Sequence, residues 1–232
     1  MSALPAVIVF ARAPRPGTTK TRLIPALGAE GAAELYGCFI ADTLTNLGCL
    51  RADIIVAAAE PDDADAVKGL LSEVRPCAHF MLQSQGDLGH RIAAAAADVL
   101  ARGHPRVVVI GTDSPTLPPR MVAQALELAV SRDCVLGPCF DGGYYLIGFP
   151  AVPHALLADI EWSSPRVLTQ TLARAQQEEL SVALLELWYD VDTPEDLSLL
   201  RRHLSWQAAA GGPIPCPRTW AALNQLLEGV PE

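Results

Sequence analysis

Short runs of apolar residues recur along the chain, and longer segments that mix apolar and polar positions separate them. Continuous apolar runs rich in valine and isoleucine are typical of strands that are buried on both faces. The pattern predicts strands at residues 6–11, 53–59, 79–83, 106–111, 133–138 and 144–149.

The segments between the strands show helical spacing, most clearly after residue 120. Apolar side chains recur there on one face of a helix, at Met121, Val122, Ala125, Leu126 and Ala129. A second helix is predicted from Pro165 and a third from Pro194, because proline suits the first helical position. Ser164 and Thr193 precede these prolines as N-cap residues.

Strands that alternate with helices predict an α/β fold of three layers, in which a mostly parallel, Rossmann-like sheet lies between helices. We expect residues 1–204 to form this domain and residues 205–232 to form a C-terminal appendage with a short helix. Sheets of this kind bind ligands beyond the carboxyl ends of their strands. Polar residues that directly follow a predicted strand are therefore the first candidates for a functional site.

Composition narrows the range of partners. Of the 232 residues, 50% are hydrophobic and 19% are charged, and the net charge is −9. An acidic chain does not suit nucleic acid or an anionic membrane, so neither is expected as a partner. The N-terminal apolar run is too short for a membrane helix and lacks the features of a signal peptide. Six cysteines without CxxC spacing favour free thiols in the cytoplasm.

Four basic side chains fall within eleven residues directly after the first predicted strand: Arg12, Arg15, Lys20 and Arg22. Gly17 and several threonines lie among them. A glycine-containing loop with cations suits phosphate oxygens, because backbone N–H groups and basic side chains can both contact the anion. The segment is not a Walker A loop. In the alternative interpretation, this is a solvated loop whose cations pair with surface acids.

Two aspartates are candidate ligands for Mg²⁺ or Mn²⁺, because these hard cations prefer carboxylate oxygens. Asp113 directly follows the strand predicted at residues 106–111, and Asp192 lies in the sequence DVDTPEDL. Both also have a purely structural interpretation. Asp113 could cap the turn that follows it, and Asp192 could favour the start of the next helix.

Two further segments have an open interpretation. The sequence DGG between two predicted strands indicates a tight hairpin. Alternatively, Asp141, Gly142 and Gly143 form a wall against which a sugar or another acceptor binds. The segment QGDLGHR at residues 85–91 is either a loop that enters a helix at Ile92 or a rim that contacts a nucleotide.

Several segments together resemble one bacterial family of unknown function, which is grouped with glycosyltransferases of the GT-A, or nucleotide-diphospho-sugar transferase, fold. These segments are FARAPRPGTTKTRL, QGDLGHR, GTDSP, GPCFDGGYYLIGF, WSS and DVDTPEDL, and the resemblance covers residues 5–204. More distantly, the KTRL loop is similar to that of the 2-phospholactate guanylyltransferases. The DVDTPEDL segment is similar to one in molybdenum-cofactor nucleotidyltransferases.

The resemblance implies a mixed sheet with one antiparallel strand and a nucleotide bound in the N-terminal half. It also implies a divalent metal ion on Asp113, together with Asp192. The nucleotide and phosphate contacts that we expect on this basis are Ala11, Arg12, Gly17, Lys20, Arg22, Gln85, Gly86, Asp87 and Thr112.

We expect an enzyme, and the residues favour nucleotidyl transfer. In this reaction a nucleoside monophosphate moves from a nucleoside triphosphate to a small phosphorylated acceptor, with Lys20, Asp113 and Asp192 as the catalytic group. Glycosyl transfer from a nucleotide sugar is the alternative that the family favours, with Asp141 as acceptor base or sugar ligand. A nucleotide-binding regulatory module without turnover is the third possibility.

Overall fold

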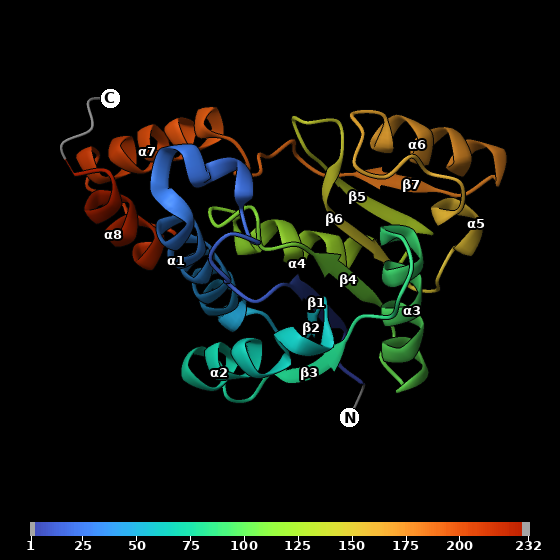
Figure 1. The fold of residues 1–232 in the computed structure, drawn as a ribbon. Helices are drawn as coiled ribbons and strands as arrows, with labels where there is room; N and C mark the ends of the chain where they lie inside the picture. Colours follow the sequence, from blue (N-terminus) through green and yellow to red (C-terminus); the bar gives the residue numbers. More distant parts are fainter. Residues whose placement is uncertain (1–2, 229–232) are drawn as a thin grey trace.

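The apolar runs form a central sheet of seven strands with helices on both faces (Figure 1). A computed structural model describes residues 3–228. The strands are β1 (Ala6–Ala11), β2 (Asp53–Ala58), β3 (His79–Leu82), β4 (Val107–Ile110), β5 (Cys134–Pro138), β6 (Tyr144–Phe149) and β7 (Val182–Leu184). The six predicted strands are confirmed to within one residue at either end. The sequence did not predict β7, because this strand has only three residues and none of them is buried.

The order of the strands across the sheet is β3-β2-β1-β4-β6-β5-β7. β1 lies parallel between β2 and β4, with Val7 opposite Ile54 on one side and Val108 on the other. β6 is antiparallel to both of its neighbours, β4 and β5, and follows β5 through the predicted hairpin. The other neighbouring pairs are parallel, so the expected mixed sheet with one antiparallel strand is confirmed.

Two layers of helices cover the sheet, which confirms the three-layer α/β fold. One face packs against α1 (Ile24–Asn46), α2 (Ala64–Val74), α4 (Pro119–Leu128), α7 (Pro194–Ala209) and α8 (Pro217–Leu226). The other face packs against α3 (Leu88–Ala101), α5 (His154–Leu157) and α6 (Val167–Gln177). Short 3₁₀ turns form η1 (Thr21–Leu23), η2 (Leu47–Cys49) and η3 (Pro61–Asp63).

The long helix α1 belongs to the core. By length and composition alone, residues 21–49 could cross a membrane. However, Leu35, Phe39 and Ile40 on α1 are fully buried in the cluster that includes Val7 and Val9 of β1. A helix that packs against a central strand in this way has its apolar residues explained by the protein core.

Capping groups set where the later helices begin. The Thr193 hydroxyl accepts a hydrogen bond from the backbone N–H of Asp196 (3.3 Å), and the Asp196 carboxylate accepts one from the Thr193 N–H (2.8 Å). The predicted start of α7 is therefore confirmed. α6 begins two residues later than predicted, because the Ser164 hydroxyl accepts from the backbone N–H of Arg166 (3.3 Å) and closes a turn first.

The C-terminal segment shares the main core. The predicted boundary between residues 204 and 205 falls inside α7, and α8 packs against α1. The Asp42 carboxylate on α1 is fully buried and accepts a hydrogen bond from the backbone N–H of Thr219 at 2.8 Å. Residues 229–232 of the predicted appendage lie outside the described residues.

Candidate functional site

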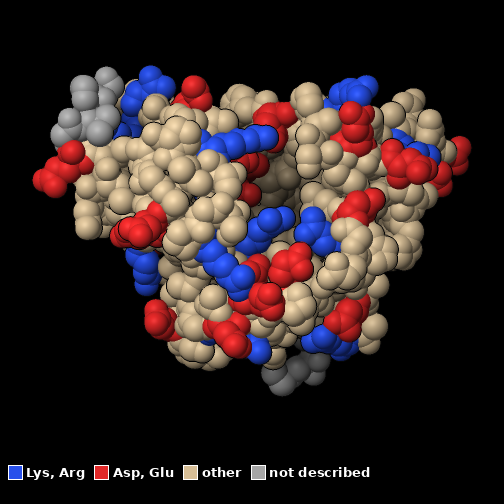
Figure 2. Space-filling model, viewed as in Figure 1, with Lys and Arg blue, Asp and Glu red and all other residues tan. Residues whose placement is uncertain are grey.

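A cleft of about 870 Å³ opens at the carboxyl ends of β1 and β4. Its walls come from the loop after β1, the start of α3, the segment after β4, the β5–β6 hairpin and two later segments, residues 162–165 and 190–192. Figure 2 shows this hollow in the middle of one face, with basic and acidic side chains gathered around its mouth. The cleft lies at the edge of the sheet where α/β folds bind ligands.

Lys20 joins the two aspartates that the sequence predicts in the site. Its Nζ donates to Asp113 Oδ1 at 2.5 Å, to Asp192 Oδ1 at 2.6 Å and to the Val191 carbonyl at 2.8 Å. An ammonium group has three N–H donors, so these contacts use all of them. The Lys20 side chain is 5% exposed, whereas each aspartate side chain is 43% exposed. The lysine is therefore enclosed, and both carboxylates stay accessible from the cleft.

The loop after β1 holds Lys20 in this place. Lys20 has a left-handed backbone (φ 49°) and directly precedes the turn η1, and the Leu23 N–H donates to its carbonyl at 2.8 Å. Thr19 ties the loop together, because its hydroxyl donates to the Ala13 carbonyl at 2.8 Å. The ammonium group also lies 5.8 Å from the ring centroid of Tyr36 and 5.7 Å from that of Phe39. Such cation–π contacts help to hold a desolvated cation.

Burial and the neighbouring negative charges shift the pKa of Lys20 in opposite directions. Burial alone would lower its pKa, but the negative charges of Asp113 and Asp192 outweigh it, so the pKa is raised and the lysine keeps its charge. Burial, together with the charge of Asp113, raises the pKa of Tyr36 to about 12. The neutral Tyr36 hydroxyl is 2.8 Å from Thr112 Oγ1, which links α1 to the segment after β4.

The structure gives these aspartates contacts beyond those of a local cap, and metal binding by them stays a prediction. The carboxylates of Asp113 and Asp192 both point to Lys20, and the start of α7 is capped by Thr193 instead. The Val191 N–H donates to the Asp113 carbonyl at 2.8 Å, so the two acidic segments are joined through their backbones. Neither aspartate acts only as a local cap.

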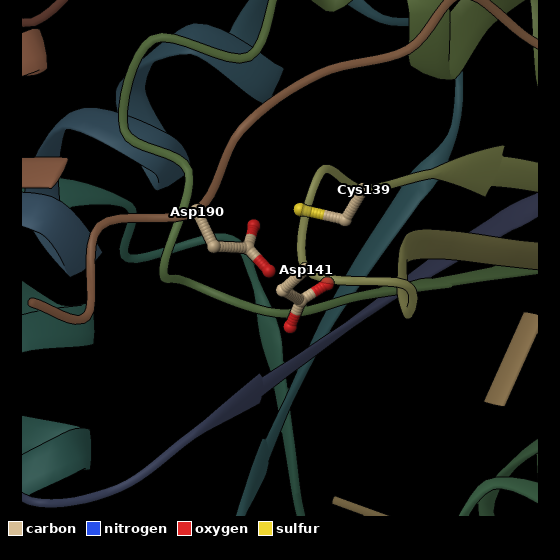
Figure 3. A group of neighbouring side chains, drawn as sticks. All are labelled: Cys139, Asp141 and Asp190. Carbon is tan, nitrogen blue, oxygen red and sulfur yellow. The ribbon is translucent and has the colours of Figure 1, made fainter. Parts of the chain in front are cut away.

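A second acidic group lies beside this centre, and it brings the predicted Asp141 together with Asp190, which was not predicted. Asp190, Asp141 and Cys139 bring two carboxylates and a thiol within 4.8 Å of one another, and Figure 3 shows Asp190 pointing toward Asp141. Asp190 also accepts a hydrogen bond from the Ser114 hydroxyl. Burial, and then the charge of Asp113, raise the pKa of Asp190 to about 6. The DVD spacing was a usable signal, because alternate residues of an extended segment share one side.

Most of the predicted site residues line the cleft. They are Ala11, Arg12, Lys20, Arg22, Thr112, Asp113, Asp141, Gly143 and Asp192. The remaining ones do not line it: Gly17, Gln85, Gly86, Asp87 and Gly142. Contact of this second group with a substrate stays a prediction.

Two residues of that second group have clear local roles. The Asp87 carboxylate accepts from the backbone N–H of His90 at 2.8 Å, so α3 begins at Leu88 rather than at Ile92 as predicted. Gly142 has φ +90°, and a Cβ atom there would lie 2.1 Å from the Pro165 carbonyl oxygen. Glycine is therefore required for the hairpin to approach residues 162–165 this closely.

The lining residues that were not predicted include Gln83, Arg91, Tyr144 and Trp162. Gln83 follows β3, and Arg91 lies in the first turns of α3. Tyr144 and Trp162 form an edge-to-face ring pair with centroids 6.2 Å apart. Arg91, Tyr144 and Trp162 lie in segments that carry the family resemblance, although these side chains were not singled out. For Gln83 the only sequence signal was position, since the carboxyl end of β3 meets the same edge of the sheet as that of β1.

The profile of the family described as "Uncharacterized protein conserved in bacteria (DUF2064)" matches residues 42–164. The chain belongs to the DUF2064 family. The matched segment includes β4, Asp113 and the β5–β6 hairpin, so it covers one side of the cleft. The predicted membership of a bacterial family with this fold is confirmed.

Two relatives of this DUF2064 protein are similar over most of their length. It is 30% identical over 190 residues to the phosphoenolpyruvate guanylyltransferase of Mycolicibacterium smegmatis, with 79% of each chain covered. A crystal structure from Desulfovibrio desulfuricans, described as a candidate nucleotide-diphospho-sugar transferase, has a TM-score of 0.86 and 33% identity. That match covers 97% of this chain and 95% of the other. Both relatives are named as transferases, which confirms the predicted enzyme class.

More distant structures share the fold. The 4-diphosphocytidyl-2C-methyl-D-erythritol synthase of Anaerococcus prevotii has a TM-score of 0.58 at 11% identity, with 88% of this chain and 96% of that one covered. At this identity the comparison supports the predicted GT-A architecture and nothing finer.

Proposed function

We propose that this protein is a metal-dependent nucleotidyltransferase that moves a nucleoside monophosphate from a nucleoside triphosphate to a small phosphorylated acceptor. The observation that carries the proposal is the contact of Lys20 with both Asp113 and Asp192 in the cleft. Two phosphate-bearing substrates bring many negative charges into one place. A catalyst for their reaction needs fixed positive charge and carboxylates that can bind a cation, and this centre holds both.

The relative from M. smegmatis supports a finer choice of substrates. Its name specifies a guanylyl group and phosphoenolpyruvate, and its identity of 30% extends over 79% of this chain. We therefore propose GTP as the first donor to test and a small phosphorylated carboxylic acid as the first acceptor.

The reaction needs no nucleophilic side chain. An oxygen of the acceptor phosphate attacks the α-phosphorus of the nucleotide and forms a new P–O bond. The bond from the α-phosphorus to the bridging oxygen breaks, and pyrophosphate leaves with the electron pair. Lys20 fixes the positions of Asp113 and Asp192, while Arg12 and Arg22 line the same cleft and can offset charge on the phosphates.

The residues of this centre fit a divalent cation. Asp113 and Asp192 each place one carboxylate oxygen on the same ammonium nitrogen, so the two carboxylates lie close together, and both side chains are 43% exposed and line the cleft. Mg²⁺ and Mn²⁺ are commonly bound by one or two carboxylates together with substrate phosphates. A bound Mg²⁺ or Mn²⁺ would polarise the phosphate oxygens and offset their negative charge.

Glycosyl transfer is the second candidate, and two observations favour it. The relative from D. desulfuricans is described as a candidate nucleotide-diphospho-sugar transferase. In addition, Asp141 and Gly143 line the cleft, where the Gly143 N–H donates to Asp141 Oδ1 at 2.9 Å. A carboxylate held in this way could bind sugar hydroxyls.

Calorimetric titration distinguishes these two functions. The four common nucleoside triphosphates and a set of nucleotide sugars are titrated into the protein with Mg²⁺ or Mn²⁺, and pyrophosphate release is then assayed with phosphoenolpyruvate. We expect binding of a triphosphate, and pyrophosphate release that requires the acceptor. Binding of a nucleotide sugar without binding of any triphosphate would reverse the order of the two candidates.

A further inference from the structure

Three arginines line the cleft without a carboxylate within 4 Å among residues 3–228: Arg12, Arg22 and Arg91. The lack of a partner is not general to this loop. Arg15 lies three residues after Arg12, and its guanidinium is 3.4 Å from Asp63 and donates to the Asp62 carbonyl. Among the cleft-lining cations, Lys20 is neutralised by Asp113 and Asp192, whereas these three arginines have no carboxylate partner in the described part of the chain.

A neutral side chain holds Arg91 in place. Gln83 is buried, and its Nε2 donates to the Ala57 carbonyl at 2.8 Å, which fixes its amide. Arg91 Nη1 then donates to Gln83 Oε1 at 3.2 Å. Arg91 Nε is buried and has no hydrogen-bond partner. The guanidinium is therefore oriented, but its positive charge is not neutralised, and one of its donors is unused.

Arg12 lines the same cleft as Arg91, so the two cations face one space. Burial, and then the positive charge of Arg12, lower the pKa of Arg91, whereas Glu60 and Asp87 raise it by smaller amounts. Two like charges at a partly buried site oppose each other, and an anion between them would remove the repulsion. Guanidinium groups suit phosphate in particular, because their N–H donors match its oxygens in pairs.

We propose that Arg91 and Arg12 form an anion clamp that binds a phosphate group of a substrate. This inference rests on the proposed function for the identity of the anion. The phosphate comes either from the terminal part of the nucleoside triphosphate or from the phosphorylated acceptor. Arg91 is then a binding residue that lines the same cleft as the centre at Lys20, next to Gln83 at the end of β3.

Titration of the full-length protein with sodium pyrophosphate tests the clamp. Three proteins are compared: the wild type, Arg91→Gln, and Arg102→Gln as a matched control. Arg102 lies at the other end of α3 and pairs with Asp98 outside the cleft. We expect the dissociation constant for pyrophosphate to rise at least tenfold in Arg91→Gln and to stay within twofold in Arg102→Gln. Arg91→Lys, which keeps the charge without the fork of donors, should give an intermediate value.

Further titrations identify the source of the phosphate. GTP, GMP and phosphoenolpyruvate are each titrated into the wild type and Arg91→Gln. If Arg91→Gln loses affinity for GTP but not for GMP, the clamp binds the terminal phosphates of the nucleotide. If the variant loses affinity for phosphoenolpyruvate alone, the clamp binds the acceptor. Either result supports the clamp. The clamp is overturned if Arg91→Gln and Arg91→Lys bind every probe within twofold of the wild type, or if the wild type binds none of them.

The clamp and the proposed function can fail separately. If the wild type transfers no nucleotide but binds pyrophosphate through Arg91, the function is wrong and the clamp stands. If the wild type transfers nucleotide and Arg91→Gln does so equally well with unchanged affinities, the clamp is wrong and the function stands.

Discussion

Lys20 Nζ lies 2.5 Å from Asp113 Oδ1 and joins the loop after β1 to the segment after β4. The two strands are parallel neighbours, so their carboxyl ends meet at one edge of the sheet. Asp192 reaches the same nitrogen from a segment much later in the chain. A cation enclosed by two accessible carboxylates thus forms the centre of the cleft.

Replacement of Asp113 by asparagine should remove metal-dependent nucleotide binding. The variant keeps the side-chain shape but loses the negative charge that a divalent cation needs. Loss of even a partner of a metal ligand lowers metal affinity about 10–100-fold, so we expect a loss of ~100-fold or more in nucleotide affinity with Mn²⁺. Calorimetry measures the nucleotide affinity, and Asp98→Asn on the exposed side of α3 is the control. Binding like that of the wild type would exclude Asp113 from the site.

Replacement of Lys20 by methionine should strengthen Mn²⁺ binding in the absence of nucleotide. In the wild type the ammonium group neutralises the two carboxylates that would bind the metal ion. An ion pair at ~4 Å and an effective dielectric of 20 contributes about 4 kcal/mol, and the variant no longer has these ion pairs to oppose metal binding. We expect at least a tenfold gain in Mn²⁺ affinity by paramagnetic resonance titration. Lys68→Met is the control, because Lys68 lies on α2 over the ring of Phe80 in β3 and does not line the cleft. Unchanged affinity would show that Lys20 and the metal ion do not share the same carboxylates.

The same variant tests contact with phosphates. Lys20→Met should weaken the binding of triphosphates more than that of monophosphates, because a triphosphate brings more negative charge into the cleft and the variant lacks the positive charge of Lys20 that offsets it. An equal loss for GTP and GMP would count against this role.

The fold could be predicted from local patterns, because buried strands carry continuous apolar runs. Val107 to Ile110 are nearly or fully buried, and this run alone located β4 and the carboxylate beyond it. The strand β7 could not be predicted, because Leu184 is half-exposed and the strand is too short to show a pattern. Pairing with β5 stabilises it, and pairing between distant segments is not visible in one sequence.

Part of the site could likewise be predicted from the pattern of strands, and the rest depends on contacts between distant segments. Asp113 and Lys20 follow adjacent parallel strands, so their proximity could be inferred from the fold. Arg91 ends the segment QGDLGHR, which was a candidate nucleotide-contacting rim, but its hydrogen bond to Gln83 joins α3 to the end of β3 and is not visible in the sequence. Asp87 shows the opposite case, since its polar segment suggested a nucleotide contact while its carboxylate caps α3.

Asp42 should stabilise the C-terminal helix. Its buried carboxylate accepts from the Thr219 N–H at 2.8 Å and lies 3.4 Å from the Arg218 guanidinium. Asp42→Ala would leave a buried N–H without an acceptor, which typically costs about 1–3 kcal/mol of unfolding free energy. Urea unfolding measures this loss. A change below about 0.5 kcal/mol would mean that α8 does not depend on this contact.

Stability should fall at mildly acidic pH through His203. Burial lowers the pKa of His203 below its ordinary value, and its ring lies 2.7 Å from the Tyr189 hydroxyl. The folded state therefore favours the neutral ring, while the unfolded chain takes up a proton more readily. The resulting stability is present above the unfolded pKa of about 6.5 and is lost as the pH falls below it. The difference in Tm between the wild type and His203→Gln should shrink from pH 7.5 to 5.5, and a constant difference would contradict this.

The fate of the α-phosphate tests the central claim most directly. The protein is incubated with GTP labelled at the α-phosphorus, phosphoenolpyruvate and Mg²⁺, and the products are separated. The account predicts that the label moves into the acceptor, that an equal amount of unlabelled pyrophosphate is released, and that Asp113→Asn transfers none. If no nucleoside triphosphate is consumed with any small phosphorylated acceptor while a nucleotide sugar donates its sugar, the cleft is the site of a different transfer.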